Sequence, residues 1–86
     1  MKTVFTPRAA EDYRYWQEND PKKFERVRQL IKAVHTDAFV GIGKPEPLKH
    51  KRPLWSRRID REHRLVYYVK DGEVIIIACR FHYTGI

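Results

Sequence analysis

The amino-acid sequence has a single cysteine, no long run of apolar residues and no leader-like N-terminus. Cys79 stands alone, so an intrachain disulfide is excluded. The longest apolar run, Val74 to Cys79, is far too short to span a bilayer. The first residues lack the apolar core and the small-residue cleavage site of a signal peptide. Together these absences predict a cytoplasmic protein that does not associate with membranes.

The clusters that bind metal ions or activate a nucleophile are also missing from the sequence. No group of acidic residues is dense enough to hold Mg²⁺, and no Cys, Ser or Thr has a convincing partner base. Cys79 and His82 are three positions apart, but on one strand such positions face opposite ways, so we reject them as a metal pair. We therefore expect neither a metal nor another cofactor.

The charge of the chain is high and unevenly placed. Residues 1–86 are predicted to form one domain, because a second hydrophobic core would not fit in this length. The net charge is +7, and the window from Lys44 to Arg64 holds eight Lys or Arg against three acids. Such a stretch fits a polyanionic partner, either nucleic acid or an acidic protein segment, and fits a solvated basic surface equally well.

Turn signals and apolar periodicity predict two helices and several strands. Thr6-Pro7 and Asp20-Pro21 each place a capping side chain before a proline, which is typical of a helix start. The expected elements are a strand over 2–6, helices over 7–19 and 21–36, irregular chain over 36–52, and strands over 54–59, 63–69 and 74–83. This order predicts an α+β fold with two N-terminal helices packed on one face of the sheet and the other face free for a ligand.

The hydrophobic pattern of the last two strands favours one register. In that register Arg64, Val66 and Tyr68 share a face with Ile76, Ala78, Arg80 and His82. The face toward the helices then collects Leu65, Tyr67, Val69, Ile75, Ile77, Cys79 and Phe81. A plain two-residue turn at Asp71-Gly72 would pair Val69 with Val74 and bury charge without a partner. We therefore expect a three- or five-residue loop, or a bulge.

Glu46 is the first candidate for chemistry. It lies between two prolines in Lys44-Pro45-Glu46-Pro47, which limits the freedom of the backbone, and Lys49 and His50 follow closely. A carboxylate fixed among cations suits a general base, but an ordinary loop carboxylate fits the same pattern. The residues alone leave both interpretations open.

Further candidates lie in the last strands. Arg80 interrupts an apolar strand, which usually indicates a buried partner or an anionic ligand, whereas Arg64 stands at a strand start where a solvated edge position is also common. His82, followed by Tyr83, suits proton donation near neutral pH, although a lone histidine is more often structural. His50 could contact a phosphate; otherwise it is interpreted, like His35 and His63, as structural or exposed.

Five segments, in order and at matching spacing over nearly the whole chain, resemble the Txe/YoeB family of toxins in the RelE superfamily. They are Asp12-Tyr13-x-Tyr15-Trp16, Gly43-Lys44-Pro45-Glu46-Pro47-Leu48-Lys49, Trp55-Ser56-Arg57-Arg58-Ile59, His63-Arg64-Leu65-Val66-Tyr67 and Ala78-Cys79-Arg80-Phe81-His82-Tyr83. The resemblance implies the RelE-like, microbial-ribonuclease-like antiparallel sheet. It also implies a metal-independent endoribonuclease that cuts messenger RNA in the A site of the small (30S) ribosomal subunit.

The same resemblance implies roles for individual residues. Glu46 matches the general base, Arg64 the arginine that stabilises the phosphate, His82 the proposed general acid and Tyr83 the neighbouring active-site tyrosine. The 2′-hydroxyl of the RNA would attack, leaving a 2′,3′-cyclic phosphate and a 5′-hydroxyl. Basic residues expected to contact RNA are Lys49, His50, Arg58 and Arg80.

The resemblance further implies a YefM-like antitoxin that covers the site, with operator DNA bound only through the toxin–antitoxin complex. A homodimer is left open. Two other functions also remain open from the sequence: a ParE-like toxin that binds gyrase, and a non-catalytic module that binds RNA or the ribosome. The set of Glu46, Arg64 and His82 favours the ribonuclease over the ParE-like toxin, which should not need a base, a cation and an acid together. The sequence alone does not separate the non-catalytic module from the enzyme, because geometry decides activity.

Overall fold

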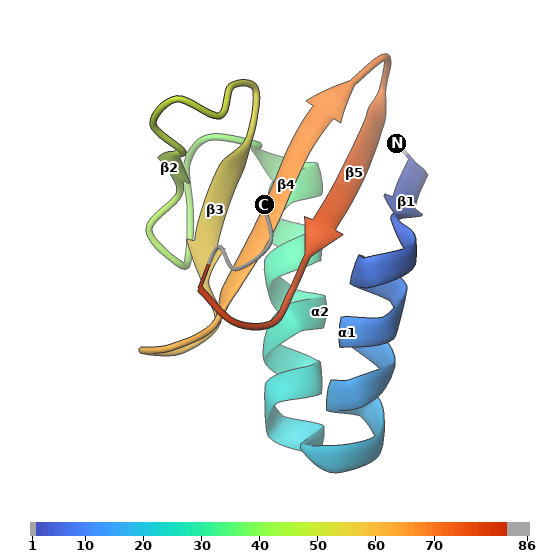
Figure 1. Ribbon diagram of the computed structural model, residues 1–86. Coiled ribbons are helices and arrows are strands. Elements are labelled where there is room, and N and C mark those ends of the chain that lie inside the picture. The colour runs from blue at the N-terminus through green and yellow to red at the C-terminus, as the bar shows by residue number, and fades with distance from the viewer. Residues whose placement is uncertain (1, 83–86) are drawn as a thin grey trace.

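A computed structural model describes residues 2–82 of the chain (Figure 1). The elements are β1 (Lys2–Phe5), α1 (Pro7–Asn19), α2 (Pro21–Thr36), β2 (Glu46–Pro47), β3 (Trp55–Arg58), β4 (Arg64–Lys70) and β5 (Glu73–Ala78). The five strands form one sheet in the order β1-β5-β4-β3-β2. The predicted α+β architecture is confirmed, and two details differ. The sheet is mixed because β1 runs parallel to β5, and the two-residue β2 was not predicted.

Both predicted helix starts are confirmed. The Thr6 hydroxyl accepts a hydrogen bond from the Ala9 N–H at 3.2 Å, and the Asp20 carboxylate accepts one from the Lys23 N–H at 3.2 Å. Each helix therefore has one of its free first-turn donors satisfied, and each carries proline at its first position. Within the described residues, neither helix is long and apolar enough to cross a membrane.

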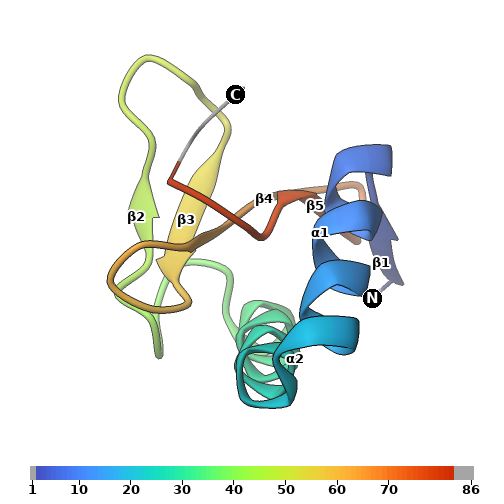
Figure 2. The ribbon, with the colours of Figure 1, turned by 60° about the horizontal axis from the view of Figure 1, so that its bottom comes forward.

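The main hydrophobic core lies between the helices and the sheet. Figures 1 and 2 show both helices on the same face. The core is built from fully buried apolar side chains of α1, α2, β4 and β5, among them Ala9, Val27, Leu30, Val34, Leu65, Tyr67, Val74 and Ile76. Burying each of the larger aliphatic side chains contributes about 1.5–3 kcal/mol. This layer therefore packs one face of the sheet against the two helices.

The β4–β5 hairpin corrects the predicted register in part. Val69 pairs with Val74 across a two-residue turn at Asp71 and Gly72, so the longer loop is wrong. The predicted bulge is present, however, because pairing shifts by one residue between Tyr67↔Ile76 and Val66↔Ala78. Gly72 (φ +76) and Asp71 (φ +52) both adopt the left-handed conformation that a tight hairpin turn requires.

The bulge reassigns the faces of β5. Val74 and Ile76 face the helices, where Ile75 and Ile77 were predicted, because the register changes only after Ile76. Beyond the bulge Ala78 lies beside Val66 on the opposite face, as predicted. Phe81 was predicted to be buried with the helices, but it is 40% exposed. The pattern of apolar residues thus predicted that the register shifts, but not where in the hairpin the shift occurs.

The sheet face away from the helices is partly covered. Leu48, Val66 and Ala78 form a second, smaller apolar cluster, with Leu54 and Ile77 packed against it. The chain between β2 and β3 folds over this face, because the Leu48 N–H donates to the Leu54 carbonyl at 2.9 Å. The expectation that this face is free is therefore wrong for the part that the cluster covers.

Candidate active site

One row of paired residues crosses the sheet on the face away from the helices. Glu46 pairs with Ser56, Ser56 with Val66, and Val66 with Ala78. Directly paired residues on neighbouring strands point to the same face, so the Glu46 side chain lies on the same face as Val66 and Ala78. Glu46 is exposed there, at the edge of the sheet (Figure 1).

Arg64 lies on this same face, diagonally across from Glu46. It pairs with Arg58 and stands two positions before Val66 on β4. Strands are about 4.8 Å apart and rise about 3.4 Å per residue, so the two backbone positions are separated by about 12 Å. The two residues therefore share a face without direct contact between their backbones.

The Arg64 guanidinium is held by backbone carbonyls. Its Nη1 donates to the carbonyls of Asp60, Arg61 and His63 at 2.8, 3.3 and 3.1 Å, and the residue is only 9% exposed. Among residues 2–82 no carboxylate forms an ion pair with it. Arg64 is therefore fixed in position while its charge is not neutralised by an acid, which is the arrangement that favours an anionic ligand.

His82 reaches the same end of the sheet through its neighbour. The Arg64 N–H donates to the Phe81 carbonyl at 3.0 Å, so the chain after β5 crosses to the start of β4 (Figure 1). His82 follows directly and is exposed. Tyr83 lies outside the described residues. The structure thus places Glu46 and Arg64 on one sheet face and His82 directly after a residue bonded to Arg64. The catalytic roles of these residues stay predictions.

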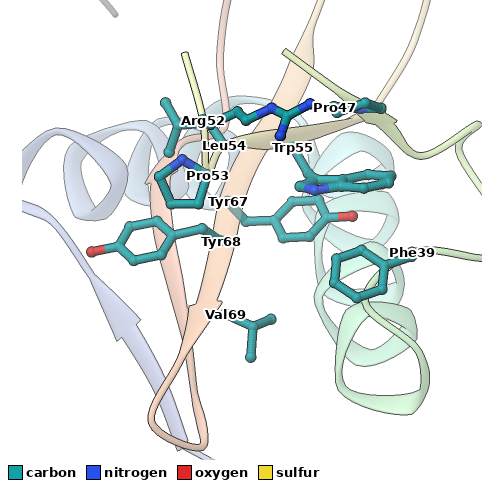
Figure 3. Close-up of a pocket in the computed structure, with 9 residues that line it drawn as sticks. All are labelled: Phe39, Pro47, Arg52, Pro53, Leu54, Trp55, Tyr67, Tyr68 and Val69. Carbon is teal, nitrogen blue, oxygen red and sulfur yellow. The ribbon is translucent and has the colours of Figure 1, made fainter. Parts of the chain in front are cut away.

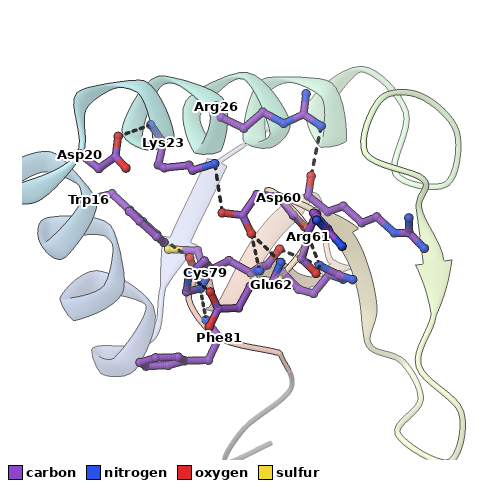
Figure 4. A network of polar contacts seen from close by, with 12 residues as sticks. Trp16, Asp20, Lys23, Arg26, Asp60, Arg61, Glu62, Cys79 and Phe81 are labelled. Atoms are coloured by element: carbon purple, nitrogen blue, oxygen red, sulfur yellow. Dashed lines mark hydrogen bonds and ion pairs between the residues drawn. The ribbon is translucent and has the colours of Figure 1, made fainter.

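The turn between β3 and β4 is a rigid polar network (Figure 4). Asp60 Oδ1 accepts from the N–H groups of Glu62 and His63 at 2.8 and 2.7 Å, and Lys23 Nζ of α2 lies 3.1 Å from Asp60 Oδ2. Burial alone would raise the pKa of Asp60, but these two backbone donors and the hydrogen bond from Lys23 outweigh it and lower the pKa. The anionic Asp60 therefore holds the turn whose carbonyls bind Arg64.

Three of the predicted RNA-binding residues are exposed around this face. Lys49 and His50 lie in the chain after β2, and Arg58 ends β3 beside Arg64. The Arg58 N–H also donates to the Gly43 carbonyl at 2.7 Å, which ties the chain before Glu46 to the sheet. Lys49 and Glu46 line one shallow pocket together with Pro47, Leu48 and Lys51. Cations thus flank the carboxylate on the open side.

Arg80 does not share the face of Arg64, and that prediction is wrong. Its guanidinium carbon lies 3.4 Å from the ring centre of Tyr15 on α1 and 4.5 Å from that of Phe81. The chain turns after Ala78, so alternation along a strand no longer decides where the side chain points. In the structure Arg80 takes part in cation–π stacking against α1. A contact of Arg80 with RNA stays a prediction.

Sequence reasoning missed several residues that hold the site together. Arg57 is fully buried and donates to backbone carbonyls of the loop after α2, while Asp12, Trp16 and His63 bind the chain after β5. A signal existed for two of them: Asp12 and Trp16 are four positions apart, on one helix face. His63 was interpreted as structural or exposed, and no pattern distinguished it.

A separate apolar pocket of about 480 Å³ opens at the other end of β3 and β4 (Figure 3). It is lined by Phe39, Pro47, Arg52, Pro53, Leu54, Trp55, Tyr67, Tyr68 and Val69. The Phe39 and Trp55 rings pack with centres 4.8 Å apart, and Phe39 is still 56% exposed. Of the predicted site residues that the structure describes, none lines this pocket, so it is separate from the Glu46–Arg64 site.

Comparison with known proteins gives a consistent result. Residues 5–83 match the family model described as "YoeB-like toxin of bacterial type II toxin-antitoxin system". The chain is 54% identical over 84 residues to Toxin YoeB of Synechocystis sp., covering 96% of this chain and 98% of that protein. The structure is similar to the YoeB/ParE toxin from Agrobacterium tumefaciens, with 44% identity, a TM-score of 0.93, and coverage of 96% and 100%. It is also similar to YoeB of Staphylococcus aureus, solved as a dimer (45% identity, TM-score 0.91) and in a YoeB-YefM complex (44%, 0.89), each covering 96% of this chain and 98% of that one.

Proposed function

Because the chain belongs to the YoeB-like family of toxins from bacterial type II toxin-antitoxin systems, we propose that it is an endoribonuclease that cuts messenger RNA in the ribosomal A site. The observation that carries this proposal is the shared sheet face of Glu46 and Arg64, with the Phe81 carbonyl bonded to the Arg64 N–H just before His82. A base, a cation and an acid are the parts that RNA cleavage needs when no metal takes part.

The proposed reaction is a transesterification within the RNA. Glu46 takes the proton of the 2′-hydroxyl, and the 2′ oxygen forms a bond to the adjacent phosphorus. Arg64 stabilises the additional negative charge on the phosphorane. The bond from phosphorus to the 5′ oxygen then breaks, and His82 donates a proton to that oxygen. The products are a 2′,3′-cyclic phosphate and a 5′-hydroxyl. Tyr83 remains a candidate for orienting the phosphate.

The environments of Glu46 and Arg64 support their proposed roles. Glu46 is exposed on a two-residue edge strand whose one neighbour among the described strands is β3, so a substrate can approach it from the open side. Arg64 is held by three carbonyls and has no acidic partner in the described part of the chain. A preorganised cation costs little reorganisation when charge develops, which is why such fixed groups are effective in catalysis.

The proposed partners are messenger RNA, the ribosome and a YefM-like antitoxin, in the cytoplasm. The Staphylococcus aureus relative forms a YoeB-YefM complex and a YoeB dimer, which supports an antitoxin partner and a homodimer for this chain. The basic window from Lys44 to Arg64 suits both RNA and an acidic antitoxin segment. Operator DNA would be bound only through the antitoxin complex.

The decisive experiment uses ribosomes programmed with a defined messenger RNA. We expect the protein to cut the RNA in the A site, and mapping of the ends should give a 2′,3′-cyclic phosphate and a 5′-hydroxyl. A messenger with a single 2′-deoxy nucleotide on the 5′ side of the scissile bond should bind and resist cleavage. Efficient cutting of the deoxy substrate would disprove 2′-hydroxyl attack. Inhibition of gyrase without RNA cleavage would instead support a ParE-like function.

A further inference from the structure

The three residues after β5 are held largely by side chains from outside the strand, with one backbone bond from Arg64. The Cys79 N–H donates to Asp12 Oδ2 at 3.0 Å, and the Cys79 carbonyl accepts from Trp16 Nε1 at 2.7 Å. The Arg80 carbonyl accepts from Arg8 Nη2 at 3.2 Å. Phe81 is bound at both its N–H and its carbonyl. This segment, residues 79–81, is the last part of the chain before His82.

Three of the side chains form one stripe along α1. Arg8, Asp12 and Trp16 are four positions apart, so they project from the same helix face toward the segment. Asp12 is 7% exposed and Trp16 4% exposed, and Arg8 Nε lies 3.6 Å from Asp12 Oδ2. Burial raises the pKa of Asp12 despite the Cys79 N–H and the Arg8 charge, which act in the opposite direction. Burying a carboxylate costs free energy. Packing alone therefore does not explain why a carboxylate binds the backbone here.

His63 completes the set from the opposite side. Its Nδ1 accepts a hydrogen bond from the Phe81 N–H at 2.7 Å, and its ring meets Trp16 edge-on with centres 4.8 Å apart (Trp16 and Phe81 are labelled in Figure 4). The next residue, Arg64, donates its N–H to the Phe81 carbonyl at 3.0 Å. His63 and Arg64, which are consecutive in the chain, therefore bind both backbone polar groups of Phe81.

Phe81 is held in a conformation that it would not adopt by itself. Its φ is +68, in the left-handed region that L residues other than glycine seldom occupy. Such a conformation persists only where surrounding contacts impose it, and it redirects the chain that follows. At this position the redirected chain is His82, which leaves the turn beside Arg64.

We propose that Arg8, Asp12, Trp16 and His63 form a cradle of positioning residues that fixes segment 79–81 and thereby sets His82 beside the scissile phosphate. This inference rests on the proposed function for the role of His82. None of the four touches the substrate in this scheme. A displacement of about 1 Å in a reacting group can cost about 100-fold in rate, so a loose cradle lowers turnover with little effect on substrate binding.

The test compares His63→Ala with the conservative His63→Asn, in which the amide oxygen replaces Nδ1 as the acceptor. Two quantities are measured: kcat and KM on programmed ribosomes, and the hydrogen-exchange rate of the Phe81 amide. We expect His63→Ala to lower kcat about 100-fold at nearly constant KM and to speed Phe81 exchange. His63→Asn should restore most of both. Trp16→Phe, which removes the indole N–H donor and one of the two fused rings but keeps an aromatic ring, should also lower kcat.

A matched control is His35→Ala. His35 is also half-buried and lies 2.6 Å from the Thr3 hydroxyl through Nε2, but on the far side of the fold. The His35→Ala variant should lose about as much stability as His63→Ala, while its kcat and its Phe81 exchange rate stay as in the wild type. The comparison separates positioning from a general loss of stability.

The outcomes are distinct. Wild-type kcat and wild-type Phe81 exchange in His63→Ala would overturn the cradle. Faster exchange with unchanged kcat would show that the cradle has no part in placing His82, and would overturn the proposal. If the wild-type protein failed to cut RNA on ribosomes, the proposed function would fall and the catalytic role of the cradle with it, whatever the exchange rates showed.

Discussion

Arg57 Nε donates a hydrogen bond to the Tyr67 hydroxyl at 3.1 Å, and both side chains are 0% exposed. The guanidinium also donates to the carbonyls of Asp37, Val40 and Ile42, and the Tyr67 hydroxyl donates to the Ala38 carbonyl at 2.7 Å. Burial raises the pKa of Tyr67, although the Arg57 contact acts in the opposite direction. One buried pair therefore fixes the loop after α2, which leads directly to the segment of Glu46.

Replacing Arg57 should destabilise the protein. Arg57→Met removes the buried donor of the hydrogen bonds to the Tyr67 hydroxyl and to the carbonyls of the loop after α2, and the combined cost should be about 3 kcal/mol. The measurement is the free energy of unfolding in urea. Arg58→Met is the matched control, because Arg58 is exposed and its replacement should change stability by no more than about 0.5 kcal/mol. Equal losses in the two variants would show that the Arg57 network is not important.

Glu46→Gln should retain the fold and lose the reaction. The amide keeps the shape of the side chain but cannot accept the 2′ proton, so the cleavage rate on ribosomes should fall by roughly 10²–10⁴-fold. RNA and antitoxin affinities should remain close to wild type. Because β2 is a two-residue edge strand, little stability depends on this side chain. A wild-type cleavage rate would remove Glu46 as the base.

RNA binding should weaken as salt increases. Exposed cations that contact phosphates release counterions, with a slope of about −0.7 in log affinity against log salt for each single-strand contact. Lys49→Ala and Arg58→Ala should each reduce that slope by somewhat less than one unit, as measured by binding titrations between low and moderate salt. Affinity that does not change with salt would mean that the basic residues face away from the RNA.

The turn that carries Arg64 should loosen in acid. The pKa of Asp60 is lowered in the folded state, so its contribution to stability is present above the unfolded value of about 3.9 and is lost as the pH falls through the folded value. Asp60→Asn should therefore be less stable than wild type at pH 7, with the difference vanishing in strong acid. Urea unfolding at several pH values measures this. A difference that grew below pH 4 would contradict the assignment.

The Cys79 thiol should be inert in the native protein. It is 0% exposed, and burial, together with the negative charge of Asp12, raises its pKa far above the usual range. Because the thiolate is the reactive form, iodoacetamide should alkylate Cys79 very slowly at pH 8. In urea the same chain should react at the rate of an ordinary thiol, which serves as the control. Rapid alkylation under native conditions would indicate that the segment after β5 opens readily.

Local signals predicted the helices well. Thr6-Pro7 and Asp20-Pro21 act over three or four residues, and both helices begin where these signals stand. Apolar periodicity gave the faces of α2 and β4 for the same reason, since neighbours along one element decide them. The strand order and the parallel pairing of β1 depend on contacts across the chain, which no short segment encodes.

The site was predictable from motif chemistry only in part. Glu46, Arg64 and His82 were identified from residue type and resemblance, and the sheet pairing brings Glu46 and Arg64 to one face, with the chain at His82 bonded beside Arg64. Arg80 was misplaced because the chain leaves the sheet at Ala78, where alternation ends. His63 was missed because its function in the fold is a bond to the Phe81 backbone, and backbone partners leave no trace in the sequence.

The two edge strands of the sheet limit how copies of this chain can associate. On one side β2 has only two residues, and Pro47 has no N–H to offer to another strand. On the other side β1 has four residues. Short edges of this kind are poor templates for strand addition, which protects against aggregation. A second copy would therefore have to dock through side chains rather than extend the ladder, and it would meet a like charge of +7 as it approached.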